Sequence, residues 1–207
     1  MAYLQDLKKM LIAQDKEQAL ALTHRFLEAG NLLVFYEEVI PEILNSIACE
    51  QGDYTCVYHE HRMSAMMRML VEVSYDYVLK AKQQRKVDKT VLVACLKGET
   101  HELGAVIGSY LLEYYGFKTI LTGADTPLKT LLAGIAHAKC DYLVLSVTNA
   151  YNLVEFNKVL ANIKAHYPKL KIYGAGRGAL KQKTHLLVDG MLSKVADIEA
   201  LIDKEGL

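Results

Sequence analysis

The chain has 207 residues, of which 52% are hydrophobic, so it can bury the core of one large domain or of two small ones. Its 24 basic and 24 acidic residues cancel to a formal net charge of zero, which argues against direct binding to nucleic acid or to an anionic membrane surface. Because the sequence shows neither a signal-peptide pattern nor an apolar run of membrane-spanning length, we expect a cytoplasmic protein.

Helical periodicity dominates the chain up to about residue 83. Helices are expected over about residues 3–13, 15–30, 33–49 and 53–83. Asp15, with Gln18 as its partner, provides an N-cap for the second helix, and Pro41 should kink or break the third. We therefore predict an all-α four-helix bundle over residues 1–83, which the polar stretch 82–89 links to the rest of the chain.

From Thr90 onward, strand-like and helix-like segments alternate, which is typical of a doubly wound parallel sheet. The expected strands lie near 90–96, 118–122, 141–146, 170–173 and 187–189. The expected helices lie near 103–115, 127–138, 151–166 and 192–203. The sequence therefore predicts a flavodoxin-like α/β domain with a five-stranded parallel sheet over residues 88–207.

The cysteines show no metal-binding or redox spacing, and Cys95 and Cys140 fall within or just before apolar runs. Thiols in such positions are usually small core residues. For Cys49 and Cys56 the sequence gives no pairing pattern either, so we expect no structural disulfide. The methionine cluster at 63–69 is expected to fill core in the fourth helix.

A histidine follows the first predicted strand, in the stretch Glu99-Thr100-His101-Glu102-Leu103-Gly104. It lies at the carboxyl end of a strand, where open α/β sheets collect their ligands. Small or polar residues end two later strands, in Ser146-Val147-Thr148 and in Gly174-Ala175-Gly176. Taken alone, His101 would more often be an ordinary loop histidine, but the small and polar residues at the same sheet edge favour a ligand site.

This combined pattern resembles the cobalamin-binding domain family, whose signature is Asp-x-His-x-x-Gly, a later Ser-x-Leu or Ser-x-Thr, and a glycine pair. The resemblance covers about residues 88–205. Glu99 replaces the commoner aspartate, as in the family's light-sensing regulators, and an alanine separates Gly174 from Gly176 where the family has adjacent glycines. The resemblance implies a base-off cobalamin (adenosyl-, methyl- or hydroxocobalamin) with His101 as the lower cobalt ligand.

The resemblance also implies roles for the neighbouring residues. A metal-bound imidazole usually donates its other N–H to a carboxylate or carbonyl, so Glu99 is expected to orient His101 unless it is an exposed loop carboxylate. Gly104 should leave room for the nucleotide tail of the cofactor. The other residues expected against the cofactor are Thr100, Asp125, Ser146, Thr148, Gly174 and Gly176. Beside Asp125, Thr126 and Pro127 fit a helix cap equally well.

The stretch His59-Glu60-His61 in the fourth predicted helix resembles the Glu-His segment of B12 photoreceptors. In that family, a histidine of the bundle takes the upper cobalt position after light breaks the cobalt–carbon bond. The match makes Glu60 a cofactor contact and His61 a candidate upper ligand, with solvent-facing helix histidines as the alternative. The chain contains no tryptophan, and with nine residues between the family's tryptophan and its Glu-His segment, Glu50 would take the place of that tryptophan.

These features favour a cobalamin-binding sensory protein, light-responsive through the upper cobalt ligand, over an enzyme. The alternatives are a corrinoid methyl carrier that serves a methyltransferase and a haem sensor on the same fold. A nucleotide or flavin domain is disfavoured because neither Gly-x-x-x-x-Gly-Lys-Ser/Thr nor Gly-x-Gly-x-x-Gly follows the first strand. Regulators of the family carry a DNA-binding domain ahead of the bundle, whereas this sequence begins in the bundle. We therefore expect a protein partner for signal output or a further upstream domain, and self-association into a homo-oligomer stays open.

Overall fold

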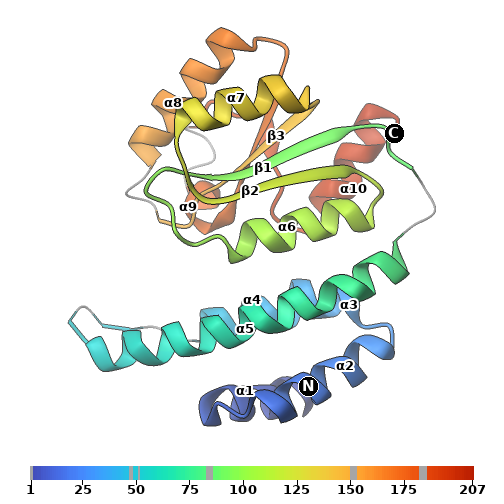
Figure 1. The fold of residues 1–207 in the computed structure, drawn as a ribbon, viewed down its shortest axis with the longest axis vertical. Helices are drawn as coiled ribbons and strands as arrows, with labels where there is room; N and C mark the ends of the chain where they lie inside the picture. The colour runs from blue at the N-terminus through green and yellow to red at the C-terminus, as the bar shows by residue number, and fades with distance from the viewer. Residues whose placement is uncertain (1, 47–48, 51, 83–85, 150–152, 182–185) are drawn as a thin grey trace. The chain divides into compact units, whose positions relative to one another are not determined.

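The structure is a computed structural model that describes residues 2–46, 49–50, 52–82, 86–149, 153–181 and 186–207 (Figure 1). The chain divides into two compact units, Met1–Ala81 and Lys82–Leu207. The first is helical, and the second contains a parallel sheet with helices on both faces. None of the described helices is long and apolar enough to span a membrane.

The helical unit consists of α1 (Ala2–Ala13), α2 (Lys16–Glu28), α3 (Leu32–Val34), the π-helical segment η1 (Phe35–Val39), α4 (Ile40–Asn45) and α5 (Tyr54–Ala81). The cap predicted for α2 is present, because the Asp15 carboxylate accepts a hydrogen bond of 3.0 Å from the N–H of Gln18. The core contains the fully buried side chains Leu7, Leu11, Phe35, Met66, Met67 and Leu70. Methionines of α5 therefore fill core, as predicted.

The third predicted helix is interrupted next to Pro41. Proline has no N–H to donate, and its ring clashes with the carbonyl four residues earlier, so a regular α-helix cannot continue through it. The chain widens into η1 just before this point, where the N–H of Ile40 donates to the carbonyl of Phe35. The helix then ends at Asn45, earlier than the periodicity of the sequence suggests.

The expectation of no disulfide is wrong. Cys49 and Cys56 are bonded, with their Cα atoms 5.5 Å apart. The carboxylate of Asp53 accepts a hydrogen bond of 2.9 Å from the N–H of Cys56, and this cap fixes where α5 begins. The start of α5 thus brings together two thiols whose spacing in the sequence has no recognisable pattern. Cys95 and Cys140 are free thiols.

The α/β unit has a five-stranded parallel sheet in the order β2-β1-β3-β4-β5. Its strands are β1 (Thr90–Leu96), β2 (Lys118–Thr126), β3 (Tyr142–Ser146), β4 (Lys171–Ala175) and β5 (Gly190–Met191). Its helices are α6 (Leu103–Tyr114), α7 (Leu128–Ala138), α8 (Leu153–His166), α9 (Gly176–Lys181) and α10 (Val195–Glu205). The predicted flavodoxin-like fold is confirmed. The short helix α9 was not predicted, and β5 lies just beyond its predicted position.

The strand order reverses between β1 and β3, so the loops that follow these two strands frame the switch point of the sheet. Side chains alternate between the two faces along each strand. Ala94 and Leu145 pack with α7, α8 and α9 in one core cluster. Their neighbours Cys95 and Ser146, which pair in register, therefore face the opposite side of the sheet.

Candidate functional site

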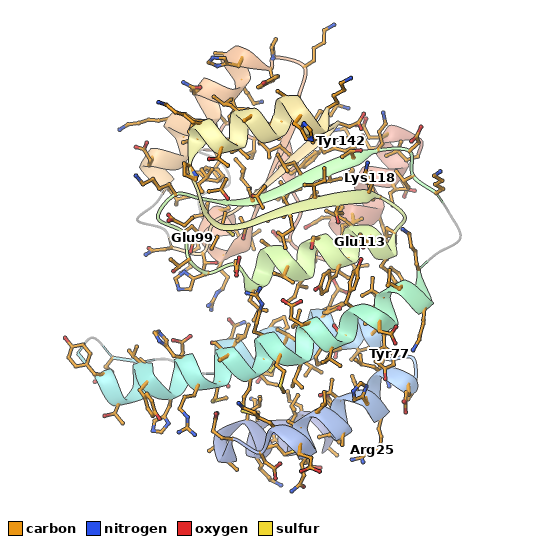
Figure 2. All side chains as sticks on the ribbon, in the orientation of Figure 1. Arg25, Tyr77, Glu99, Glu113, Lys118 and Tyr142 are labelled. Atoms are coloured by element: carbon orange, nitrogen blue, oxygen red, sulfur yellow. A yellow bond between two sulfur atoms is a disulfide. The ribbon has the colours of Figure 1, made fainter. Side chains whose placement is uncertain are left out.

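The loop after β1 carries Glu99, whose side chain is only 1% exposed. Figure 2 labels it at the edge of the sheet where β1 leads toward α6. One carboxylate oxygen, Oε1, accepts a hydrogen bond of 3.0 Å from the N–H of His101 and lies 2.6 Å from Nδ1 of the same residue. The other oxygen, Oε2, accepts hydrogen bonds from the backbone N–H groups of Thr148 and Asn149, at 2.9 and 3.0 Å. Glu99 therefore joins the loop after β1 to the loop after β3.

Burial alone would raise the pKa of Glu99, but the hydrogen bonds donated by Asn149, His101 and Thr148 together outweigh it and hold this pKa below its ordinary value. The side chain is thus a carboxylate at neutral pH. Since a carboxylate can only accept hydrogen bonds, its short contact with His101 requires the proton on Nδ1. In the neutral form of the ring, this leaves Nε2 of His101 as the nitrogen that can bind a metal.

The His101 side chain is 60% exposed, although the carboxylate that holds it is buried. This combination suits a metal ligand, because the buried carboxylate orients the imidazole while its other nitrogen, Nε2, stays accessible to a metal. Among the described residues, no group of three or more His, Cys, Asp or Glu could hold a metal ion. A single imidazole is the protein ligand required by a metal whose equatorial ligands come from a macrocycle.

Ser146 and Cys95 lie beneath this loop. Ser146 is 1% exposed and is hydrogen-bonded to the Cys95 thiol, which also lies 3.9 Å from the carbonyl of His101. Burial, followed by the charges of Glu99 and Glu102, raises the pKa of Cys95 to about 12, so the thiol stays protonated. Ser146 is therefore part of the floor of the site, whereas Thr148 contributes its backbone N–H to Glu99.

Thr100 and Gly104 are both exposed. The carbonyl of Thr100 accepts a hydrogen bond of 3.0 Å from the N–H of Glu102, in the turn that leads into α6. A Cβ added to Gly104 would meet no atom within 4 Å. Packing within the chain therefore does not require glycine at this position, and the space above the start of α6 is open.

The glycines after β4 have different environments. Gly176 has a φ of +85°, and a Cβ added there would lie 2.5 Å from the carbonyl oxygen of Val147. A Cβ on Gly178 would lie 2.9 Å from the Thr148 carbonyl oxygen, and the N–H of Gly178 donates to the Val147 carbonyl at 2.9 Å. These two glycines close the first turn of α9 onto the loop after β3. Gly178 was missed from the sequence, although the Gly-Arg-Gly spacing was available to indicate it.

Gly174 lies farther from this loop. It pairs with Leu145 and so belongs to the face of the sheet opposite Ser146. A Cβ added there would lie 3.0 Å from the sulfur of Met191. The close neighbours of Gly174 are thus residues of the core under the sheet.

Asp125 is exposed, and its carboxylate accepts a hydrogen bond of 2.7 Å from the N–H of Gly98. Pro127, rather than Thr126, is the N-cap of α7. The Thr126 hydroxyl instead bonds to the hydroxyl of Thr122 at 3.0 Å. The helix cap considered for Thr126 and Pro127 therefore lies one residue later in the chain.

Glu60 and His61 lie in α5, in the helical unit. The His61 side chain is 74% exposed, and its Nε2 lies 3.6 Å from Oε2 of Glu60. The other carboxylate oxygen of Glu60, Oε1, accepts a hydrogen bond of 3.1 Å from the Ser64 hydroxyl. Every side chain from Tyr54 to Arg62 is at least partly exposed, and Met63 is the first buried residue of the helix. His61 is thus accessible within its own unit.

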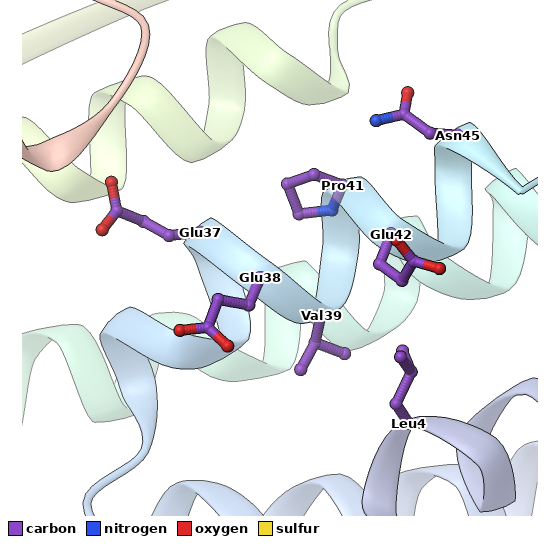
Figure 3. A pocket seen from close by; sticks show the side chains of 7 residues that line it. All are labelled: Leu4, Glu37, Glu38, Val39, Pro41, Glu42 and Asn45. Carbon is purple, nitrogen blue, oxygen red and sulfur yellow. The ribbon is translucent and has the colours of Figure 1, made fainter. Parts of the chain in front are cut away.

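A pocket of about 440 Å³ lies elsewhere in the helical unit, between α1 and the η1–α4 segment (Figure 3). Its lining residues are Leu4, Glu37, Glu38, Val39, Pro41, Glu42 and Asn45. Glu42 forms an ion pair with Lys8 at 3.3 Å. None of the residues predicted to bind the cofactor lines this pocket.

Fold and site together define an α/β cofactor-binding protein that presents one oriented imidazole at the switch point of its sheet. The chain belongs to the B12 binding domain family, which residues 89–197 match. It therefore belongs to a class of cobalamin-binding proteins, as the motif around His101 predicts.

Two curated relatives have different functions. The chain is 26% identical over 155 residues to the HTH-type transcriptional repressor CarA of Myxococcus xanthus, covering 75% of this chain and 52% of the repressor. It is also 26% identical over 116 residues to trimethylamine corrinoid protein 1 of Methanosarcina mazei, covering 54% of each. The chain thus spans about half the length of the curated relatives it matches.

Solved structures share the fold. The monomethylamine corrinoid protein of Methanosarcina barkeri matches with a TM-score of 0.70 at 15% identity, over 98% of this chain and 97% of that one. A chain of the methanol:cobalamin methyltransferase complex from the same organism matches with a TM-score of 0.51 at 16% identity, over 99% of this chain and 79% of that one. Both matches extend over the helical unit and the α/β unit of this chain.

Proposed function

We propose that the protein is a sensory cobalamin-binding protein in which His101 is the lower cobalt ligand and Glu99 fixes its orientation. The observation that carries this proposal is the contact of 2.6 Å between the buried Glu99 carboxylate and Nδ1 of His101. An imidazole held in this way can replace the benzimidazole of the cofactor. Because Glu99 holds Nδ1, the other nitrogen, Nε2, is the one that can bind cobalt.

The residues around His101 fit a cobalamin. The ionised Glu99 favours a strongly donating imidazole, and the open space at Gly104 gives a nucleotide tail a route past the start of α6. The bound cofactor would supply a cobalt centre whose upper ligand can be exchanged. Adenosyl-, methyl- and hydroxocobalamin share the lower face that His101 would bind. The match to the B12 binding domain family favours a corrin over haem as the bound macrocycle.

The sensing step is assigned to His61. Its side chain is exposed and so accessible to a metal, and the Glu60 carboxylate beside it can accept a hydrogen bond from the N–H of the imidazole nitrogen that does not bind the metal. Similarity to a transcriptional repressor supports a regulatory role. Because this chain carries no net charge, we propose that a protein partner, rather than direct nucleic-acid contact, transmits the state of the cofactor.

Photolysis tests the sensing role. Protein loaded with adenosylcobalamin or methylcobalamin should, after illumination, show a bis-histidine absorption spectrum that persists in the dark. His61→Ala should give an aquo-type spectrum instead, whereas His59→Ala, two residues away on a different face of α5, should behave like the wild type. If both variants photolyse to the wild-type product, His61 is not a cobalt ligand and the sensing role fails.

The second candidate function is a methyl carrier for a methyltransferase, which similarity to trimethylamine corrinoid protein 1 supports. In that case, the lower face of the cofactor would be held in the same way, but the upper face would exchange methyl groups with a partner enzyme. If a methylamine methyltransferase transfers the methyl group of a methylamine to the reduced, loaded protein and releases the demethylated amine, this function is favoured over sensing.

A further inference from the structure

The loop that carries Glu99 and His101 is tied to the end of β2 at several points. The N–H of Lys97 donates to the Thr126 carbonyl at 3.0 Å, and the Glu102 carboxylate accepts a hydrogen bond of 2.8 Å from the N–H of Ala124. Between these two ties lies Asp125, which contacts the loop twice. Its carboxylate accepts from the N–H of Gly98 at 2.7 Å, and its own N–H donates to the Glu99 carbonyl at 3.0 Å.

The backbone of β2 explains why Asp125 can reach the loop. The pairing between β1 and β2 shifts register twice, so that Ala94 pairs with Gly123 and Leu96 pairs with Thr126. The residues between Gly123 and Thr126 are thereby released from the ladder, as in a β-bulge. Asp125 has a φ of +50°, a left-handed conformation that costs free energy for most residues but that aspartate, asparagine and glycine tolerate best.

We propose that Asp125 is a positioning residue, which fixes the backbone of Glu99 and through it the orientation of His101, and not a contact of the cofactor. This inference rests on the proposed function, because it assigns Asp125 to the histidine ligand. The physical reason is that Glu99 must place both of its oxygens at once, one on His101 and one on Thr148 and Asn149. A backbone shift at Glu99 would break one of these contacts. Asp125 holds that backbone at two groups, the N–H of Gly98 and the carbonyl of Glu99.

Three variants separate the side chain of Asp125 from its backbone conformation. Asp125→Gly relieves the left-handed strain but removes the acceptor for Gly98, whereas Asp125→Asn keeps both an acceptor oxygen and tolerance of positive φ. Asp125→Ala loses both. The matched control is Lys139→Gly, because exposed Lys139 ends α7 with a φ of +49° and lies outside the proposed site.

Two readouts apply to these variants. The first is titration with hydroxocobalamin, followed by the histidine-ligated absorption spectrum and by the dissociation constant. The second uses cofactor-free protein, in which ¹⁵N chemical shifts of the His101 ring report its tautomer. Thermal unfolding of each variant distinguishes loss of positioning from loss of fold.

We expect Asp125→Gly to keep the unfolding temperature of the wild type but to bind hydroxocobalamin about tenfold more weakly, the effect of losing roughly one hydrogen bond to the loop. Its His101 ring should show a mixture of tautomers without cofactor, where the wild type shows the Nδ1–H form. Asp125→Asn and Lys139→Gly should match the wild type in both readouts. Asp125→Ala should bind as weakly as Asp125→Gly and also unfold at a lower temperature.

The proposal is overturned if Asp125→Gly retains the wild-type tautomer and dissociation constant. It is also overturned if Asp125→Asn loses as much affinity as Asp125→Gly while its His101 ring keeps the wild-type tautomer, because Asp125 would then act on the cofactor without acting through His101. Failure of the proposed function looks different. In that case wild-type protein would bind no cobalamin, while the tautomer difference between wild type and Asp125→Gly would persist and support the positioning role.

Discussion

The carboxylate of Glu99 accepts a hydrogen bond of 2.9 Å from the backbone N–H of Thr148, which lies 49 residues further along the chain. This bond crosses the switch point of the sheet and joins the two loops that frame it. The other carboxylate oxygen of Glu99 holds His101, so one buried side chain sets both the shape of the site and the tautomer of the proposed ligand.

Replacing Glu99 with glutamine tests this dual role. Glutamine has the same shape, but its amide N–H₂ cannot accept hydrogen bonds, so either His101 or the N–H groups of Thr148 and Asn149 lose their partner. We expect the affinity for hydroxocobalamin to fall about tenfold to a hundredfold, as measured by absorbance titration. The control is Glu17→Gln, at an exposed position in α2, which should leave affinity unchanged. An unaltered dissociation constant in Glu99→Gln would remove Glu99 from the site.

The stability difference between wild type and Glu99→Gln should depend on pH. The pKa of Glu99 is lower in the folded protein than its ordinary value of 4.5. A carboxyl group with a depressed pKa stabilises the fold above its unfolded pKa, and this contribution is lost as pH falls through the folded pKa. The difference in urea midpoint between wild type and Glu99→Gln should therefore be greatest near neutral pH and should shrink below about pH 4. A difference that stays constant across this range would show that the charge of Glu99 adds nothing to stability.

Gly176→Ala should destabilise the α/β unit for two reasons, positive φ and a Cβ only 2.5 Å from the Val147 carbonyl oxygen. Gly206→Ala isolates the first reason, because Gly206 also has positive φ, at +65°, but has no atom within 4 Å of an added Cβ. We expect Gly206→Ala to cost about 1 kcal/mol and Gly176→Ala to cost clearly more, in chemical denaturation at neutral pH. Equal losses would mean that the loop after β3 moves aside readily.

The Cys49–Cys56 disulfide predicts a thiol count. Unreduced, denatured protein should react with a thiol reagent at only Cys95 and Cys140, the two free cysteines. Closing a loop with a sequence separation of 7 should contribute about 2 kcal/mol to the stability of the helical unit. Cys56→Ser should therefore lower its unfolding temperature, whereas Cys140→Ser should reduce the thiol count without that effect. Reaction of all cysteines in the unreduced protein would contradict the disulfide.

Most of the α/β architecture could be predicted from the sequence, because a buried parallel strand is a continuous apolar run. The run at Thr90–Leu96 coincides with β1, and it places His101 at the carboxyl edge of the sheet. The hydrogen bond from His101 to Glu99 could also be anticipated, since a metal-bound imidazole usually donates its other N–H to a carboxylate, and Glu99 is two residues away in the sequence. Its bonds to backbone N–H groups could not, because they depend on how the loop after β3 folds.

The end of β2 shows why other parts of the fold and site could not be predicted from the sequence. The strand was expected to stop at residue 122, but it continues through exposed Asp125 to buried Thr126, and this extension has no apolar pattern. The tie between Asp125 and Gly98 exists only because of the register shifts in that extension. The disulfide likewise depends on where α5 begins, and Gly178 depends on a helix too short to show periodicity.

Electron paramagnetic resonance of the loaded protein in the cob(II)alamin state tests most directly whether His101 binds cobalt. Protein should be prepared with ¹⁵N-labelled histidine and loaded with unlabelled cobalamin, so that the lower nitrogen ligand reveals its origin in the superhyperfine splitting. Coordination by His101 predicts that the triplet splitting of unlabelled protein becomes a doublet on labelling, and that His101→Ala loses the doublet while His137→Ala keeps it. A triplet that persists in the labelled wild type would show that the benzimidazole stays on cobalt and that His101 is not the ligand.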